Sequence, residues 1–228
     1  MANVNFFTSG DPTSETVAYY FGGLRNTISG DSPSTTRNVL RAMQTNTFNI
    51  AIKISHHTSG DAYRSDSNLR AFYNSFSSIS GDTTQIINKL NSLEEQLANQ
   101  TLTAAGGTPG SLPLNRRRIF CFYSAGNNVF SRLFDLGFFT DIAITEGIVH
   151  LDDLYSRRSN EKILQVANNA DAGIRQSVIR EESGNSPSLA AQISQIQSAA
   201  SVFFTQTETS HENIPSEFIA GEITRLTS

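Results

Sequence analysis

The residues best suited to chemistry stand in short loops built from serine, glycine and an acid or amide. Thr-Ser-Gly-Asp occupies residues 8–11 and recurs at 58–61, and Ser-Ala-Gly-Asn occupies 124–127. Such loops cap helices, and their exposed backbone N–H groups can also bind phosphate or carboxylate. The acid/base candidates beside them are His57, Asp61, Asp11 and Glu146.

These loops would form a site only if the strands before them lie parallel, because ligands of open α/β sheets bind where the strands end. A phosphorylated or nucleotide-like molecule would then suit an enzyme or binding domain. Helix capping is the favoured explanation, because the chain has neither a P-loop nor a dinucleotide fingerprint. The predicted ligand-binding residues are Ser9, Gly10, Ser59, Gly60, Ser124, Gly126 and Asn127.

Metal and thiol chemistry find little support. His56 and His57 are neighbours that point to opposite faces of a predicted strand, and His150 and His211 stand at no ligand-like spacing from them. Cys121 lies inside an apolar run, where burial makes a thiol a poor nucleophile. We therefore expect no metal and no cofactor.

One serine segment resembles the nucleophile segment of lipase-like serine hydrolases. It is Gly30-Asp31-Ser32, with Gly126-Asn127 as a possible oxyanion element. In that family the serine follows a strand, whereas Ser32 is predicted to follow a helix and recurs as Ser186. We interpret both serines as structural.

The first half of the chain alternates strand-like and helix-like patterns. Residues 3–7 and 48–54 are predicted strands, and residues 17–24, 34–43 and 83–100 carry apolar residues at helical spacing. The segment after residue 83 has an apolar seam, with Glu94 and Glu95 on the predicted polar side. The recurring loops suggest an internally repeated strand-helix-turn-helix unit of about 50 residues.

The second half follows a Gly/Pro-rich linker at residues 101–114. Residues 119–123 and 202–205 are predicted strands, residues 163–182 one long helix, and helices are expected again from residues 189 and 215. Residues 183–188 also match residues 29–34. The prediction is one compact domain over 1–228, with halves 1–100 and 115–228. Its fold class is α/β (or α+β), a mixed sheet of about four to five strands covered by amphipathic helices.

Composition guides the choice of function. The net charge of −4 gives no basic field for nucleic acid, no apolar stretch is long enough to span a membrane, and the first residues do not resemble a secretion signal. The Ser/Thr/Asn-rich chain therefore suggests a non-enzymatic structural or assembly protein of a viral or phage-like particle. Its partners would be copies of itself or other protein subunits, in the cytoplasm or the assembled particle. The alternative is the enzyme or binding domain described above.

Overall fold

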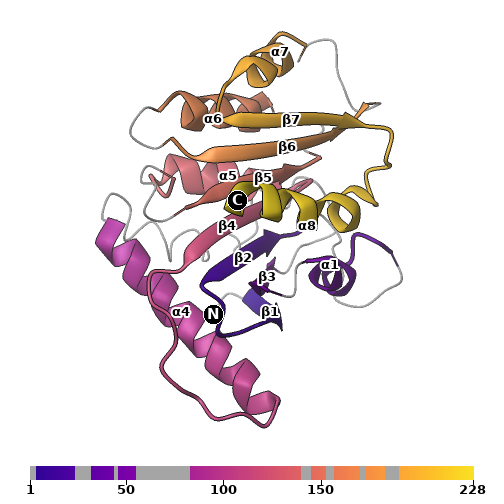
Figure 1. Ribbon diagram of the computed structural model, residues 1–228. Coiled ribbons are helices and arrows are strands. Elements are labelled where there is room, and N and C mark those ends of the chain that lie inside the picture. Colours follow the sequence, from indigo (N-terminus) through magenta and orange to yellow (C-terminus); the bar gives the residue numbers. More distant parts are fainter. Residues whose placement is uncertain are drawn as a thin grey trace.

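A computed structural model describes residues 4–23, 32–43, 46–54, 83–139, 145–152, 157–169, 173–182 and 190–228. Its strands form one seven-stranded sheet in the order β1-β3-β2-β4-β5-β6-β7 (Figure 1). The strands are β1 (Val4–Gly10), β2 (Thr16–Phe21), β3 (Phe48–Ile54), β4 (Arg117–Tyr123), β5 (Gly147–Leu151), β6 (Arg175–Glu181) and β7 (Val202–Thr207).

All neighbouring strands from β3 across to β7 are parallel, and β1 alone runs antiparallel, against β3 at one side of the sheet. The parallel strands therefore begin at a common edge, the amino edge, and end at the opposite one, the carboxyl edge. Because β1 is reversed, Gly10 at its end pairs with Phe48 at the start of β3. Loops after β2 and β4 thus share the carboxyl edge, whereas the loop after β1 lies at the amino edge.

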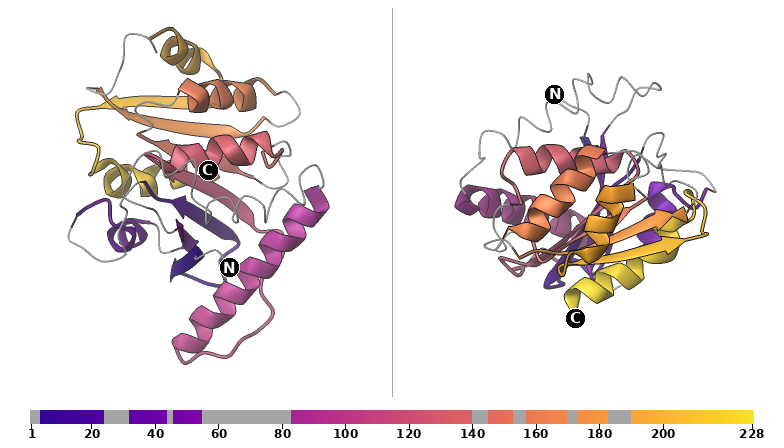
Figure 2. Two further views of the ribbon diagram at one scale, coloured as in Figure 1. Left: turned by 180° about the vertical axis from the view of Figure 1, so that it is seen from behind. Right: turned by 90° about the horizontal axis from the view of Figure 1, so that it is seen from above.

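Helices cover both faces of this sheet. One face packs against α4 (Thr83–Ala104), α5 (Gly126–Asp135), α6 (Arg157–Asn168) and α7 (Ala190–Ser198). The other packs against α1 (Thr36–Ala42) and α8 (Ile214–Thr227), so the sheet is the middle of three layers (Figure 2). Among the described helices, none has the length and apolar character to cross a bilayer.

Two segments predicted as helix are strands. Residues 17–21 belong to β2, and residues 175–181, expected within one helix running to residue 182, form β6. Both strands are buried on both faces, so neither shows the alternation typical of half-exposed strands. In β2 the apolar residues are consecutive, whereas in β6 the buried residues include the polar Gln176, Ser177 and Arg180. The apolar spacing in these runs also fits a helix, and tertiary packing decides between the two.

The α/β class is confirmed, with seven strands in place of about four to five, and the internal repeat is not confirmed. The predicted strand at 48–54 and the predicted helices beginning near residues 34, 83, 189 and 215 are present as β3, α1, α4, α7 and α8. In the first half β2 replaces the helix that the repeat required, while residues 55–82 and 183–189 lie outside the described ranges.

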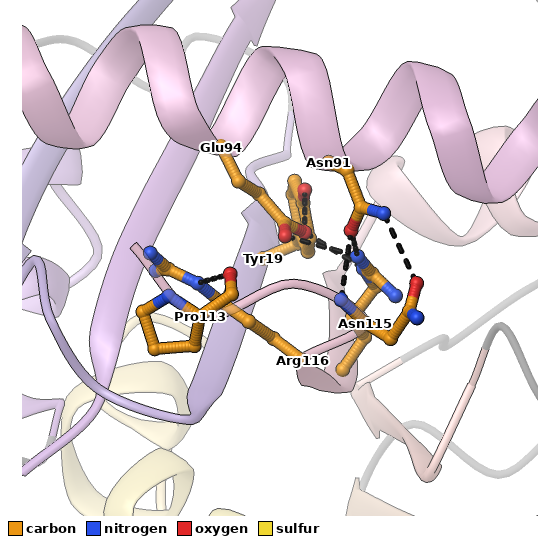
Figure 3. Close-up of polar contacts among 7 residues, drawn as sticks. Tyr19, Asn91, Glu94, Pro113, Asn115 and Arg116 are labelled. Carbon is orange, nitrogen blue, oxygen red and sulfur yellow. Dashed lines mark hydrogen bonds and ion pairs between the residues drawn. The ribbon is translucent and has the colours of Figure 1, made fainter. Parts of the chain in front are cut away.

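A buried polar network ties α4 to the sheet near the amino edge (Figure 3). The Glu94 carboxylate accepts hydrogen bonds from Arg118 Nε at 2.7 Å, Arg118 Nη2 at 3.0 Å and the Tyr19 hydroxyl at 2.6 Å. Arg118 Nη2 also donates to Asn91 Oδ1 at 2.7 Å. The prediction that Glu94 lies on a polar outer face is therefore wrong, because Glu94 is buried. Burial of the Tyr19 hydroxyl, followed by the nearby Glu94 carboxylate, raises the pKa of Tyr19.

Candidate functional site

Ser124 stands at the carboxyl edge, between the end of β4 and the start of α5. Its backbone φ is +50°, the left-handed region that serine rarely occupies. Its N–H donates to the Leu151 carbonyl, so the strand ladder holds the residue where the chain turns sharply into the helix. This elbow presents a half-buried serine hydroxyl at the edge of the sheet.

Two residues from distant loops meet this hydroxyl. His211, in the connection between β7 and α8, places Nε2 at 3.1 Å from Ser124 Oγ, and its Nδ1 lies 2.5 Å from Asp152 Oδ2. The His211 side chain is 32% exposed, whereas that of Asp152 is fully buried. Hydroxyl, imidazole and carboxylate therefore form a continuous chain from the surface to the interior.

Asp152 is held as firmly as Ser124. It directly follows β5 with φ of +47°, and its N–H donates to the Ile179 carbonyl of β6. Its second carboxylate oxygen, Oδ1, accepts the Glu181 N–H at 3.0 Å. Non-glycine residues in the left-handed region persist only where the surrounding structure holds them, and they concentrate at functional sites. Two residues of one hydrogen-bonded chain share that conformation here.

Glycines let the end of β2 approach the elbow. A Cβ on Gly126 would lie 2.4 Å from the Phe21 carbonyl oxygen, and one on Gly23 would lie 2.9 Å from Ser124 Cβ. Neither position has room for a side chain. The backbone of residues 22–23 therefore lies against Ser124.

Tyr123 supports the loop that carries His211. Its hydroxyl donates to the His211 carbonyl at 3.2 Å, and the two rings lie 5.0 Å apart. Burial, followed by the nearby Asp152 carboxylate, raises the pKa of Tyr123, so the phenol stays protonated as a donor.

A hydroxyl bonded to an imidazole, which is itself bonded to a buried carboxylate, can carry out nucleophilic acyl chemistry. The imidazole removes the hydroxyl proton, and the carboxylate holds the ring and stabilises its protonated form. The order serine, acid, histidine along the chain is the one typical of α/β-hydrolase sheets, where the serine sits on a strained strand-to-helix turn.

The predicted site residues do not gather at one place. Ser124, Gly126 and Asn127 lie at the carboxyl edge, as the parallel-strand hypothesis expects. Ser9, Gly10 and Asp11 lie at the amino edge because β1 is antiparallel, and Asp11 forms a turn by bonding Thr13. Glu146 precedes β5 at that same edge and pairs with Arg117. His57, Asp61, Ser59 and Gly60 lie outside the described residues, as do Gly30 and Asp31.

Asp152 and His211 were not predicted as site residues. Asp152 lies outside the elements predicted from the sequence, and His211 was considered as a metal ligand, for which its spacing from His56 and His57 does not fit. The serine itself was obscured because Phe122 stands where the usual Gly-x-Ser-x-Gly motif has its first glycine. The available signal was a serine between a buried apolar run and a helix, with Gly126 two residues later.

No protein-family model matches the chain, and no curated protein matches it in sequence. Solved structures do share its fold. A lipase-esterase related protein from Clostridium acetobutylicum has a TM-score of 0.52 at 10% identity, covering 99% of this chain and 100% of that one. An esterase from Rhodococcus has a TM-score of 0.48 at 11% identity, covering 99% and 94%, and the Vlm2 thioesterase domain one of 0.47 at 12% identity, covering 99% and 98%.

We predicted a non-enzymatic structural or assembly protein, such as a virion component, and this prediction is therefore wrong. The solved structure with a TM-score of 0.52 is a lipase-esterase related protein, so the fold resembles that of hydrolases. Composition alone had suggested an assembly protein, but a Ser/Thr/Asn-rich surface is equally compatible with an enzyme.

Proposed function

We propose that the protein is a serine hydrolase that cleaves carboxylic esters, with Ser124 as nucleophile, His211 as general base and Asp152 as the carboxylate that orients His211. The observation that carries this proposal is the continuous hydrogen-bonded chain from Ser124 Oγ through both nitrogens of His211 to Asp152. The strained conformation of Ser124 supports it independently.

In this mechanism Ser124 Oγ attacks the ester carbonyl carbon while its proton passes to His211 Nε2. The resulting tetrahedral oxyanion collapses, the C–O bond to the alcohol breaks, and His211 returns the proton to the departing alkoxide. Water then attacks the acyl-enzyme, again giving its proton to His211. The carboxylic acid leaves, and Ser124 recovers its proton.

The oxyanion would be bound by backbone N–H groups at the elbow. In α/β-hydrolase sheets the residue after the serine supplies one donor and the loop after a neighbouring strand supplies the other. Here these are the N–H of Ala125 and an N–H of residues 22–23, which lie against Ser124 because Gly23 and Gly126 leave no room for side chains. Each such donor contributes roughly 10²–10³-fold to kcat in comparable enzymes.

The test is hydrolysis of p-nitrophenyl acetate and p-nitrophenyl butyrate, together with covalent labelling by a fluorophosphonate. We expect activity in the wild type, label on Ser124, and loss of both in Ser124→Ala with an unchanged circular dichroism spectrum. Ser14→Ala is the matched control, because Ser14 lies near the amino edge and bonds the Asn46 carbonyl. Label on another serine, or full activity in Ser124→Ala, would refute the proposal.

A further inference from the structure

Beneath the Ser124 elbow lies a second polar chain that takes no part in the reaction described above. It consists of Asn127 on α5, His150 on β5 and Gln176 on β6, all fully buried. Asn127 Oδ1 lies 2.9 Å from His150 Nδ1, and Gln176 Oε1 lies 2.8 Å from His150 Nε2. Buried polar side chains need defined partners, so this chain fixes the relative positions of its three elements.

The chain reaches the elbow through the Asn127 amide nitrogen. Nδ2 donates to the Phe122 carbonyl at 3.3 Å and to the Ser124 carbonyl at 3.2 Å. These carbonyls flank the sharp turn on both sides, so one amide group holds the strained backbone of Ser124. At the far end, Gln176 Nε2 donates to the Ile163 carbonyl of α6 at 3.0 Å.

The His150 imidazole cannot donate a hydrogen bond to both amides at once. Each amide nitrogen already donates to a backbone carbonyl, so both amide oxygens face ring nitrogens of His150. Burial, followed by the nearby Arg180 charge, lowers the pKa of His150 to about 3 despite its bond to Gln176, so the ring is neutral. A neutral imidazole has one N–H, and only one amide oxygen receives it.

The bonds at each end decide which nitrogen carries the proton. A proton on Nε2 would set the Nδ1 lone pair against Asn127 Oδ1, and turning that amide would release both elbow carbonyls. A proton on Nδ1 places the unfavourable contact at Gln176, whose amide gives up only its bond to Ile163 by turning. The ring itself is fixed by Phe130, whose centroid lies 4.6 Å away in an edge-to-face contact.

We infer that His150, as its Nδ1–H tautomer, is a positioning residue that holds the Asn127 amide on the two elbow carbonyls and thereby sets the place of Ser124 Oγ. This inference rests on the proposed function for its kinetic consequence. Its structural part is that a protonated His150 Nδ1 donates to Asn127, and this can be tested without measuring activity. A misplacement near the nucleophile costs up to about 10²-fold in rate.

Two substitutions separate positioning from simple packing. His150→Asn puts an amide group near the place of Nδ1 and keeps a donor for Asn127, whereas His150→Gln reaches the place of Nε2 and keeps only the Gln176 contact. We expect kcat for p-nitrophenyl acetate to fall roughly tenfold to hundredfold in His150→Gln with KM nearly unchanged, and to be largely retained in His150→Asn. Equal kcat in the two variants would overturn the inference.

The tautomer is measured directly on wild-type protein labelled with ¹⁵N in histidine. We expect the His150 spectrum to show a protonated Nδ1 and an unprotonated Nε2, and protonation on Nε2 would overturn the inference even if neither variant folds. A wild type that hydrolyses neither ester and takes up no fluorophosphonate would refute the proposed function, while the spectrum would still decide the bond to Asn127.

Discussion

Two buried carboxylates, Glu94 near the amino edge and Asp152 at the carboxyl edge, each pair with a basic side chain. Glu94 is bound by Arg118, whose side chain is fully buried, and by the Tyr19 hydroxyl. Asp152 is bound by His211, whose side chain is 32% exposed and whose second nitrogen faces a serine hydroxyl. A guanidinium keeps its protons at any ordinary pH, while an imidazole exchanges one. The basic partner therefore distinguishes the structural pair, Glu94 with Arg118, from Asp152 with His211, which can transfer a proton.

The backbone makes the same distinction. Arg118 sits within the regular ladder of β4, where it pairs with Val17. Ser124 and Asp152 both lie just past strand ends with positive φ. Asn115 beside the Glu94 network also has a positive φ, but asparagine adopts that conformation far more often than serine does. The strained serine therefore supports the proposed chemical role of the elbow, whereas the Glu94 network holds α4 on the sheet.

Of the changes that compare the two carboxylates, the largest effect should come from Asp152→Asn, which keeps the shape of the side chain but removes the charge proposed to orient His211. In a serine-histidine-aspartate chain this change lowers kcat by about 10⁴-fold, because the imidazole takes the wrong tautomer. Ester hydrolysis measured with p-nitrophenyl butyrate should show this loss, with the unfolding midpoint altered far less. Retained activity would mean that Asp152, like Glu94, is a structural carboxylate.

Glu94→Ala should reverse that pattern. Removing one partner of a buried ion pair leaves Arg118 charged and unpaired, and the free energy of unfolding should fall by about 3–5 kcal/mol. Urea denaturation measures this loss, and Glu95→Ala, an exposed neighbour on α4, is the control. The kcat of the protein that remains folded should stay near that of the wild type. A large fall in kcat would contradict the division between the two edges.

Gly126→Ala tests whether the close approach of β2 to the elbow matters. The added methyl group would lie 2.4 Å from the Phe21 carbonyl oxygen, so the backbone must shift. Overpacking of this kind costs about 1–3 kcal/mol of stability, and we expect kcat to fall with it because Ser124 moves. Gly221→Ala on α8 is the control, since its Cβ would meet no atom within 4 Å. A stable, fully active Gly126→Ala would contradict this packing.

The smallest effect is expected from Tyr123→Phe, which removes the hydrogen bond to the His211 carbonyl and keeps the ring. One such bond contributes about 0.5–1.5 kcal/mol. Thermal unfolding should show a small decrease, and kcat should fall by less than in Asp152→Asn. An effect as large as that of Asp152→Asn would give the phenol a direct part in the reaction.

Much of the fold follows from local patterns, and the exceptions have a shared cause. The predicted strand at 48–54 and the predicted helix from residue 83 are correct because one face of each is distinctly apolar. The helix predicted over residues 17–24 is a strand, and the helix predicted over 163–182 ends at Asn168 and is followed by β6. Both errors arise because β2 and β6 are buried on both faces, which removes the period of two. Periodicity cannot separate such strands from helices.

The site was harder to predict from the sequence than the fold, for a different reason. Ser124 could be selected from its place after a buried strand, but Asp152 and His211 belong to loops 28 and 87 residues away, by the difference of their numbers. Only the strand order, with β4 beside β5, and the return of the chain through β7 bring them together. The antiparallel course of β1, which takes Ser9 and Asp11 to the amino edge, also depends on pairing that no local pattern encodes.

The left-handed conformation of Ser124 lowers the stability of the fold, while the proposed reaction requires the Ser124 hydroxyl. Glycine adopts this conformation without the steric penalty that a serine side chain meets, so Ser124→Gly would relax the elbow while removing the hydroxyl. A screen of variants that rewards thermal resistance alone would therefore tend to select against Ser124, the proposed nucleophile. Improving this protein requires selecting for both properties together.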